Sequence, residues 1–175
     1  PAMNCPRWYV FDCHFHDIIY APLNYNVRMH HVTVKFKRLT DRAVVPSYQS
    51  EHAAGMDLYS ANEEPISIEP KEIALIPLGF SMALPDHFEA QVRPRSGLST
   101  KFGITLPNSP GTIDADYRGE VSVPLINHGS ETFVVEPNMR IAQMIVSPVV
   151  QATFEVVEDL SETVRGASGF GSTGS

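Results

Sequence analysis

The sequence predicts an all-β protein, a jelly-roll-like β barrel with one short helix. Short runs that alternate apolar and polar residues recur from residue 31 onward, a pattern typical of barrels and double-sheet jelly rolls. The 14 prolines are scattered through these runs and their connections, which argues against long helices. No internal repeat or second domain is visible, and 175 residues are enough for one domain with its own core.

The expected strands follow one another between residues 32 and 157. Residues 32–37 read Val-Thr-Val-Lys-Phe-Lys and residues 88–93 read Phe-Glu-Ala-Gln-Val-Arg, and both have the period of two that a half-buried strand shows. The other expected strands are apolar or alternating runs at 73–76, 120–127, 132–135, 141–146 and 153–157. Because two of these runs flank His128-Gly129-Ser130, a hairpin is predicted there.

The single helix is expected just after the strand at 88–93. Ser96 is predicted to be its N-cap, and residues 97–102 form its turns. Gly103 is predicted to end it, because glycine adopts the left-handed conformation that closes many helices.

The stretch from Gly111 to Val121 concentrates reactive side chains. It holds two carboxylates, an aromatic ring and an arginine between two glycines, and it leads into an alternating apolar run. This predicts a hairpin tip before a buried strand. The carboxylates either serve chemistry or bond their own backbone, as turn residues do. An ion pair between Asp116 and Arg118 would stiffen the tip and contribute about 0–1 kcal/mol, so Asp116 is interpreted as structural.

Both ends of the chain differ from its middle. Residues 1–30 mix aromatics, histidines and prolines without a sustained period, and we expect an N-terminal extension, a tag or another non-core segment outside the β domain of residues 31–164. Residues 165–175 are rich in glycine and serine, as flexible ends are. The alternative is a phosphate-binding flap that orders on a ligand, because glycine N–H groups, hydroxyls and Arg165 bind anions and Phe170 can stack on a base.

Charge and hydropathy argue against several classes of protein. A formal charge of −7 and a pI near 5.4 argue against a broad nucleic-acid surface, and a negatively charged small substrate would then need local positive groups or a metal ion. No apolar run approaches the roughly 18 residues that span a bilayer, and polar residues interrupt residues 1–20, where a signal peptide would lie. Cys5 and Cys13 form no disulfide framework. We expect a cytoplasmic protein without membrane contact or direct nucleic-acid binding.

Five motifs carry a resemblance to a known family. In chain order they are Ala53-Ala54-Gly55-Met56-Asp57-Leu58, Pro94-Arg95-Ser96-Gly97-Leu98-Ser99, residues 111–121, Arg140-Ile141-Ala142-Gln143-Met144, and residues 165–174. Together they resemble the homotrimeric dUTP diphosphatase (dUTPase) family, whose motifs have the same order. The match runs from about Val32 to Gly174 and implies a β jelly roll, in agreement with the strand pattern. Ser99 and Ser168 stand where alanine or glycine is commoner in the family.

The resemblance implies hydrolysis of dUTP to dUMP and pyrophosphate by attack of water on the α-phosphorus, which limits uracil in DNA and supplies dUMP. Asp114 would be the general base, and Gln143 would lie near the α-phosphate. The triphosphate would be handled as its Mg²⁺ complex, with Asp57 contacting the water shell of the metal. From the residues alone, Asp57 can also form an Asx turn after Gly55, and Gln143 can be an outward polar side chain of a strand.

The resemblance also implies a set of substrate-binding residues. Uracil would be read by backbone groups and Asn108, which leaves no room for a 5-methyl group, and Tyr117 would lie under the deoxyribose so that a 2′-hydroxyl clashes with its ring. Arg95 and Ser96 would bind phosphate oxygens. The full expected set is Arg95, Ser96, Gly97, Asn108, Gly111, Ile113, Tyr117, Arg165, Phe170, Gly171, Ser172 and Thr173.

In trimeric relatives the first, second and fourth motifs come from one subunit, the third from another and the tail from the last. The resemblance therefore implies a homotrimer with shared active sites. Two alternatives remain. A dCTP deaminase of the same fold would need an acid/base group at the cytosine ring, whereas this sequence has the hydrolase-type stretch at 111–121. A catalytically silent nucleotide-binding or signalling relative would keep the pocket without turnover, and the intact Asp114, Gln143 and tail argue against it.

Overall fold

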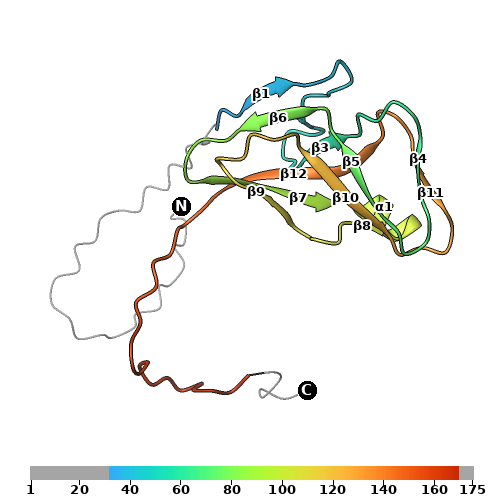
Figure 1. The fold of residues 1–175 in the computed structure, drawn as a ribbon. Helices are drawn as coiled ribbons and strands as arrows, with labels where there is room; N and C mark the ends of the chain where they lie inside the picture. The colour runs from blue at the N-terminus through green and yellow to red at the C-terminus, as the bar shows by residue number, and fades with distance from the viewer. Residues whose placement is uncertain (1–31, 170–175) are drawn as a thin grey trace, which may run out of the picture. The chain divides into compact units, whose positions relative to one another are not determined.

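The structure is a computed structural model that describes residues 32–169 (Figure 1). The expected extension of residues 1–30 and the expected binding residues Phe170, Gly171, Ser172 and Thr173 lie outside the described residues. Within residues 32–169 there is one helix, α1 (Ser96–Phe102), and no helix of this part has the length and apolarity to span a bilayer. The strands are β1 (Lys35–Arg38), β2 (Ser47–Tyr48), β3 (Met56–Tyr59), β4 (Ile66–Ile68), β5 (Ile73–Pro77), β6 (Phe80–Ala83), β7 (Phe88–Pro94), β8 (Ile104–Thr105), β9 (Gly111–Ile113), β10 (Ser122–Asn127), β11 (Phe133–Val135) and β12 (Arg140–Pro148).

The described strands form four sheets around an apolar core (Figure 1). The largest has the order β2-β3-β12-β7-β9, the next is β5-β10-β8, and β1-β6 and β11-β4 are two-stranded. All neighbouring strands in these sheets are antiparallel. Leu58, Ile76, Phe80 and Leu125 are fully buried in the core. The arrangement is a jelly-roll-like β fold, so the predicted fold class is confirmed.

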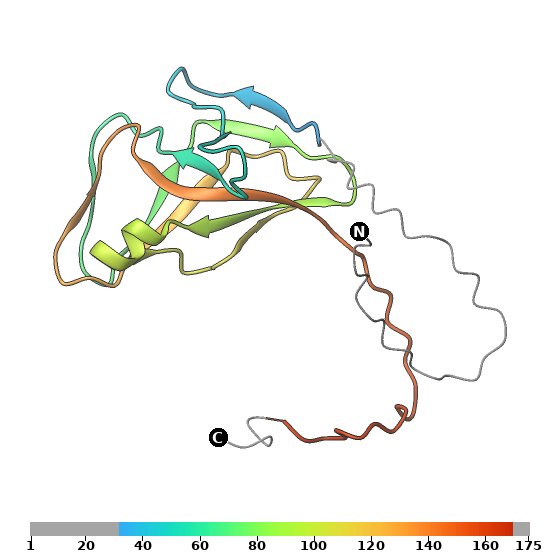
Figure 2. The ribbon, with the colours of Figure 1, turned by 180° about the vertical axis from the view of Figure 1, so that it is seen from behind.

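Strand β12 lies in the middle of the largest sheet and carries part of the site. It pairs with β3 on one side and β7 on the other (Figure 2). Gln143 lies directly opposite Asp57 of β3. The register shifts between Arg140 and Ala142, which marks a β-bulge. The bulge explains how Ile141 and Ala142 are both buried although they are neighbours. It also separates the side chain of Arg140 from the regular alternation that follows.

The hairpin predicted around His128-Gly129-Ser130 is wrong. Strand β10 pairs with β5 and β8, whereas β11 pairs with β4, so the two strands belong to different sheets. The fully buried Asn127 causes the separation. Its Nδ2 donates to the carbonyls of Ile68 at 2.9 Å and Glu131 at 2.8 Å, and its Oδ1 accepts from the N–H of Gly129 at 2.8 Å. These bonds fix a turn that directs the chain towards β4 instead of back along β10.

The strand predicted at residues 153–157 is also wrong, because this segment has no regular secondary structure. Phe154 is 93% exposed and Val156 is 98% exposed, and every residue from 150 to 168 is exposed. A strand is stabilised by its neighbours rather than by its own residues, and this segment pairs with no strand of the described chain. The alternating apolar side chains of this segment are present, but no surface of the described chain packs against them.

Helix α1 differs from the prediction at its start and agrees at its end. The N-cap is Arg95, whose extended backbone (φ −91°, ψ 126°) makes no side-chain capping bond, so Ser96 is the first helical residue rather than the cap. The carbonyl of Arg95 accepts the N–H groups of Leu98 at 3.1 Å and Ser99 at 3.0 Å. Gly103 closes the helix with a left-handed φ of 69°, as predicted. The extended Arg95 is what turns its side chain away from the helix and towards β12.

Candidate active site

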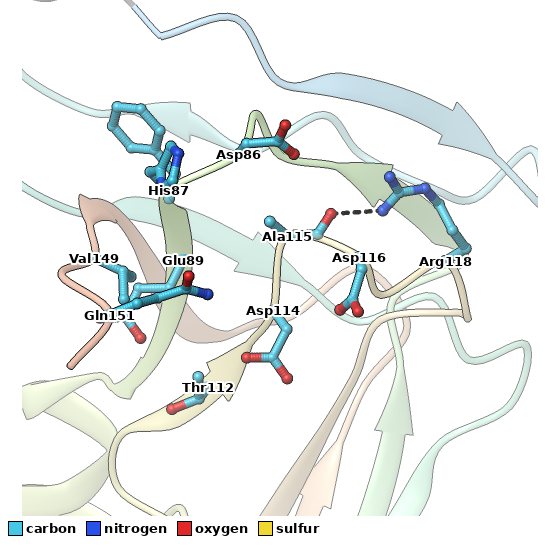
Figure 3. Close-up of a pocket in the computed structure, with 11 residues that line it drawn as sticks. Asp86, His87, Glu89, Thr112, Asp114, Ala115, Asp116, Arg118, Val149 and Gln151 are labelled. Carbon is cyan, nitrogen blue, oxygen red and sulfur yellow. Dashed lines mark hydrogen bonds between the residues drawn. The ribbon is translucent and has the colours of Figure 1, made fainter. Parts of the chain in front are cut away.

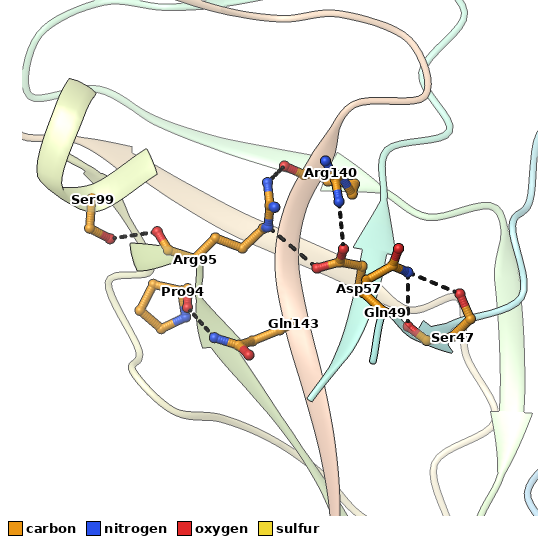
Figure 4. A network of polar contacts seen from close by, with 8 residues as sticks. All are labelled: Ser47, Gln49, Asp57, Pro94, Arg95, Ser99, Arg140 and Gln143. Atoms are coloured by element: carbon orange, nitrogen blue, oxygen red, sulfur yellow. Dashed lines mark hydrogen bonds and ion pairs between the residues drawn. The ribbon is translucent and has the colours of Figure 1, made fainter. Parts of the chain in front are cut away.

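A buried carboxylate holds two arginines where β12 begins and β7 ends (Figure 4). Asp57 Oδ1 lies 3.4 Å from Arg95 Nε, and Asp57 Oδ2 lies 3.1 Å from Arg140 Nη1. Arg95 Nη1 also donates to the main-chain carbonyl of Arg140 at 3.0 Å. The arginine side chains remain 28% and 46% exposed, so several of their guanidinium donors still face solvent. One aspartate and two arginines leave a local positive charge in an acidic protein, which suits an anionic ligand.

Gln143 lies beside this cluster and is fixed on two sides. Its Nε2 donates to the main-chain carbonyl of Pro94 at 2.9 Å (Figure 4). On the other side its Oε1 lies so close to Gly55 that a Cβ on residue 55 would be 2.4 Å away. Glycine is therefore required at residue 55 for the amide to stay in this place. The alternative of an outward polar side chain does not describe Gln143, because it is half-buried and hydrogen-bonded.

The pairing of β3, β12 and β7 explains why the first, second and fourth motifs meet. Asp57 and Gln143 are cross-strand neighbours, and Pro94 lies opposite Ala142 at the end of β7. Ser96 and Gly97 follow at the exposed start of α1, and a Cβ on Gly97 would have no atom within 4 Å. An anion can therefore approach the backbone there without a steric barrier.

Arg165, another expected binding residue, lies in the exposed tail. Its Nε donates to the carbonyl of Ser168 at 2.9 Å.

The third motif connects two sheets instead of forming a hairpin. Strand β9 pairs with β7, and β10 pairs with β5, so residues 114–121 form the connection between them. Arg118 Nη1 donates to the carbonyls of Ala115 at 2.7 Å and Tyr117 at 2.8 Å. The ion pair expected between Asp116 and Arg118 does not form within the described residues, because the guanidinium group is satisfied by the backbone of its own loop.

The third motif borders two hollows that share Asp114. The first, of about 490 Å³, is lined by Leu75, Thr112, Ile113, Asp114, Tyr117, Glu120, Val121 and Ser122. The second, of about 680 Å³, contains Asp86, His87, Glu89 and Asp116 in its wall (Figure 3). The first hollow combines three apolar side chains and one aromatic ring with four polar residues, Asp114 and Glu120 among them, and apolar walls with a few polar groups are typical of a small-molecule pocket. The second is lined mostly by carboxylates and polar groups and does not suit an anion.

The structure brings some of the predicted residues together and leaves others apart. Asp114, Ile113 and Tyr117 line the first hollow. Asn108 is exposed, and its Nδ2 lies 3.3 Å from where a Cβ on the buried Gly111 would be. Neither hollow contains the residues of the arginine cluster in its wall. The described chain therefore carries the two halves of the predicted site on separate surfaces.

Two further residues were not predicted as site residues. Arg140, the first residue of β12, binds Asp57, which lies 83 residues earlier in the chain. Its position at the start of the fourth motif is the sequence feature that could have identified it. Glu120 lines the first hollow and accepts the N–H of Gly79 at 3.0 Å through Oε1. Its position directly after Gly119 gave no indication of this contact, because Gly79 is far away in the sequence.

The described residues do not form a protein cage for a metal ion. No group of three or more His, Cys, Asp or Glu side chains within residues 32–169 has the geometry to hold one. Asp57, the residue expected to contact a metal through water, is engaged by two guanidinium groups. Mg²⁺ is usually bound by one or two carboxylates together with substrate phosphates. The residues present therefore fit a Mg²⁺ ion that is carried by a phosphate ligand.

Comparison with known proteins identifies the family. The dUTPase family model matches residues 41–174. The chain is 59% identical to the deoxyuridine 5′-triphosphate nucleotidohydrolase of Rickettsia felis and 58% identical to that of Rickettsia conorii, in each case over 142 residues that cover 81% of this chain and 96% of the relative. It also resembles the Staphylococcus bacteriophage 80alpha dUTPase solved with dUPNHPP, with a TM-score of 0.74, 26% identity, and coverage of 82% of this chain and 99% of that one. The chain belongs to the dUTPase family.

Proposed function

We propose that this chain hydrolyses dUTP to dUMP and pyrophosphate, and so limits uracil in DNA and supplies dUMP. The observation that carries the proposal is the pair of guanidinium groups held by Asp57 beside the immobilised Gln143. Such a cluster binds a polyphosphate, and the related phage enzyme was solved with dUPNHPP. The nucleotidohydrolase names of the Rickettsia relatives agree with the same reaction.

The phosphate end of the substrate would lie against the arginine cluster. Arg95 and Arg140 would donate to phosphate oxygens, and Asp57 would position both arginines. Ser96 and the open backbone at Gly97 would add donors at the start of α1. Mg²⁺ would enter with the triphosphate and reduce its charge. A water-mediated contact from Asp57 to that ion remains part of the proposal.

The chemical step would depend on Asp114. Its carboxylate would take a proton from water while the water oxygen bonds to the α-phosphorus and the bond from that phosphorus to the β-bridging oxygen breaks. Pyrophosphate is the leaving group and dUMP retains the α-phosphate. Gln143 would lie at the α-phosphate in a fixed orientation, because Pro94 and Gly55 restrict its amide on both sides. Asp114 lines the hollow in which Ile113 and Tyr117 would enclose the nucleoside, with Asn108 and the backbone at Gly111 reading uracil.

We also propose that the active site is shared within a homotrimer. Two observations support this: the arginine cluster and the Asp114 hollow are lined by different residues, and the exposed segment 150–164 carries apolar side chains that a second chain can cover. The tail from Arg165 onward, with Phe170, Gly171, Ser172 and Thr173, would close the phosphate end of a neighbouring site. The cytoplasmic location and the division into residues 1–30, 31–164 and 165–175 stay predictions.

The shared site is tested by mixing two inactive variants, Asp114→Asn and a truncation after Val164, followed by unfolding and refolding together. A working site takes its 111–121 stretch from a truncated chain and its tail from an Asp114→Asn chain. With equal amounts and random assembly, about a quarter of the sites are intact, and either variant refolded alone gives none. If both elements came from one chain, every site would carry a lesion. Absence of recovery despite proven subunit exchange would therefore contradict sharing.

The reaction is tested by measuring pyrophosphate release from dUTP, dCTP, dTTP and UTP side by side. We expect release from dUTP alone at an appreciable rate. Ammonia from dCTP would instead indicate the deaminase alternative. Nucleotide binding without any product would indicate the silent relative, and either result would overturn the proposal.

A further inference from the structure

We propose that Gly119 and the main-chain carbonyl of Glu120 set the sugar specificity of this site by fixing the ring of Tyr117. The inference rests on the proposed function, in which this ring lies under the deoxyribose. It assigns specificity to the backbone beneath the ring as well as to the ring itself. Gly119 is then a positioning residue that acts through Tyr117.

The first observation is steric. A Cβ on Gly119 would lie 2.4 Å from the phenolic oxygen of Tyr117, 2.6 Å from Cζ and 3.0 Å from Cε2. Carbon atoms do not approach a ring at these distances, since ordinary contact begins at 3.4 Å. The ring therefore lies directly on the backbone of residue 119, and only glycine leaves the space for it.

The second observation is the hydrogen bond at the end of the ring. The hydroxyl of Tyr117 donates to the carbonyl of Glu120 at 2.9 Å. The ring remains 46% exposed and lines the hollow of about 490 Å³ that also contains Asp114. Steric contact restrains the ring from below, and the hydrogen bond restrains its rotation within the loop. The exposed part forms a wall of the hollow at a defined place.

The third observation is that the chain directly after Gly119 is anchored to a neighbouring segment. Glu120 Oε1 accepts the N–H of Gly79 at 3.0 Å. On the next residue, the carbonyl of Val121 accepts the N–H of Leu78 at 3.1 Å, and the N–H of Val121 donates to the carbonyl of Phe80 at 2.8 Å. Residues 120–121 are thus attached to segment 78–80 by three hydrogen bonds. Because Tyr117 is partly exposed, a side chain added at residue 119 displaces the ring more readily than this anchored backbone.

Discrimination against the 2′-hydroxyl of a ribonucleotide depends on the position of the Tyr117 ring. One extra or missing methylene on a substrate changes discrimination in a tight pocket by about 10- to 200-fold, and a hydroxyl group is of similar size. If the ring moves by about 1 Å, the pocket gains room for such a group. We therefore expect Gly119→Ala to lower the ratio of kcat/KM for dUTP to kcat/KM for UTP by at least about tenfold. Tyr117→Phe keeps the ring and removes only its hydrogen bond, and we expect a decrease of about two- to tenfold.

The experiment measures this ratio for the parent, Gly119→Ala, Tyr117→Ala and the double variant. If Gly119 acts through the ring, the double variant has the same ratio as Tyr117→Ala. Asp116→Asn is the matched control on the same loop, because Asp116 makes no hydrogen bond or ion pair with another described residue, and its ratio should equal that of the parent. Melting temperatures establish that each variant is folded.

A ratio for Gly119→Ala within twofold of the parent overturns the inference, and so does a further decrease in the Tyr117→Ala background. If Gly119→Ala does not fold, Tyr117→Phe decides, and an unchanged ratio for this variant overturns the inference. A parent that hydrolyses dUTP while the ratios stay unchanged leaves the proposed function intact. A parent that releases no pyrophosphate from dUTP overturns both.

Discussion

Gly55→Ala should slow the enzyme strongly without unfolding it. The new Cβ would lie 2.4 Å from Gln143 Oε1, where ordinary contact begins at 3.4 Å, so the amide must retreat by about 1 Å. It can do so because Oε1 is the end of a flexible side chain, but Nε2 then loses its 2.9 Å bond to the carbonyl of Pro94. A displacement of this size costs about 100-fold in rate when the displaced group orients the reaction.

The stability of Gly55→Ala should change little. Residue 55 does not adopt a left-handed φ, so alanine is compatible with its backbone and restricts the unfolded chain slightly. We expect the free energy of unfolding to stay within about 1 kcal/mol of the parent. The measurements are kcat for pyrophosphate release at saturating dUTP and the melting temperature of the same sample.

Gln143→Ala provides the control background for this prediction. Removing the amide removes the clash, so Gly55→Ala combined with Gln143→Ala should be no slower than Gln143→Ala alone. A single Gly55→Ala variant with kcat within threefold of the parent would refute the reasoning. A further loss of rate in the Gln143→Ala background would show that residue 55 acts by another route.

The remaining predictions concern catalysis, the two ends of the chain and one strained residue. Asp114→Asn should lower kcat by about 10²–10⁴-fold and leave nucleotide affinity within about tenfold; turnover within a few-fold of the parent would remove this residue from its role. Truncation after Val164 should lower turnover severely with little change in melting temperature, because residues 165–168 are exposed and the removed tail is rich in glycine; if dUTP hydrolysis survived, the tail would be only a flexible end. Deletion of residues 1–28 should change neither turnover nor sedimentation as a trimer, and loss of the trimer would show that this segment is structural. His87→Gly should stabilise the fold by about 1 kcal/mol in urea unfolding, because His87 has a φ of 65° that disfavours a side chain; His87→Ala keeps the Cβ and should give no such gain.

Local patterns in the sequence determined the class of fold and several elements within it. The alternation at 88–93 became β7, with Ala90 and Val92 buried, because a period of two puts every second side chain on one face whatever the neighbouring strand is. Gly103 ends α1 in the left-handed conformation, since that property belongs to glycine itself. The order of the five motifs along the chain is by itself sufficient to indicate the family.

The tertiary structure alone decided which segments meet. Residues 153–157 have the alternation of a strand but find no partner in the described chain, and β10 and β11 are separated by the bonds of Asn127 to Ile68 and Glu131. The contacts of Arg140 with Asp57 and of Gly55 with Gln143 likewise depend on the pairing of β12 with β3. Periodicity tells which face of a strand is buried, whereas the choice of partner depends on packing between residues far apart in the chain. For this reason the site residues could be identified by motif, while the glycines that hold Gln143 and Tyr117 in place became apparent only from the folded backbone.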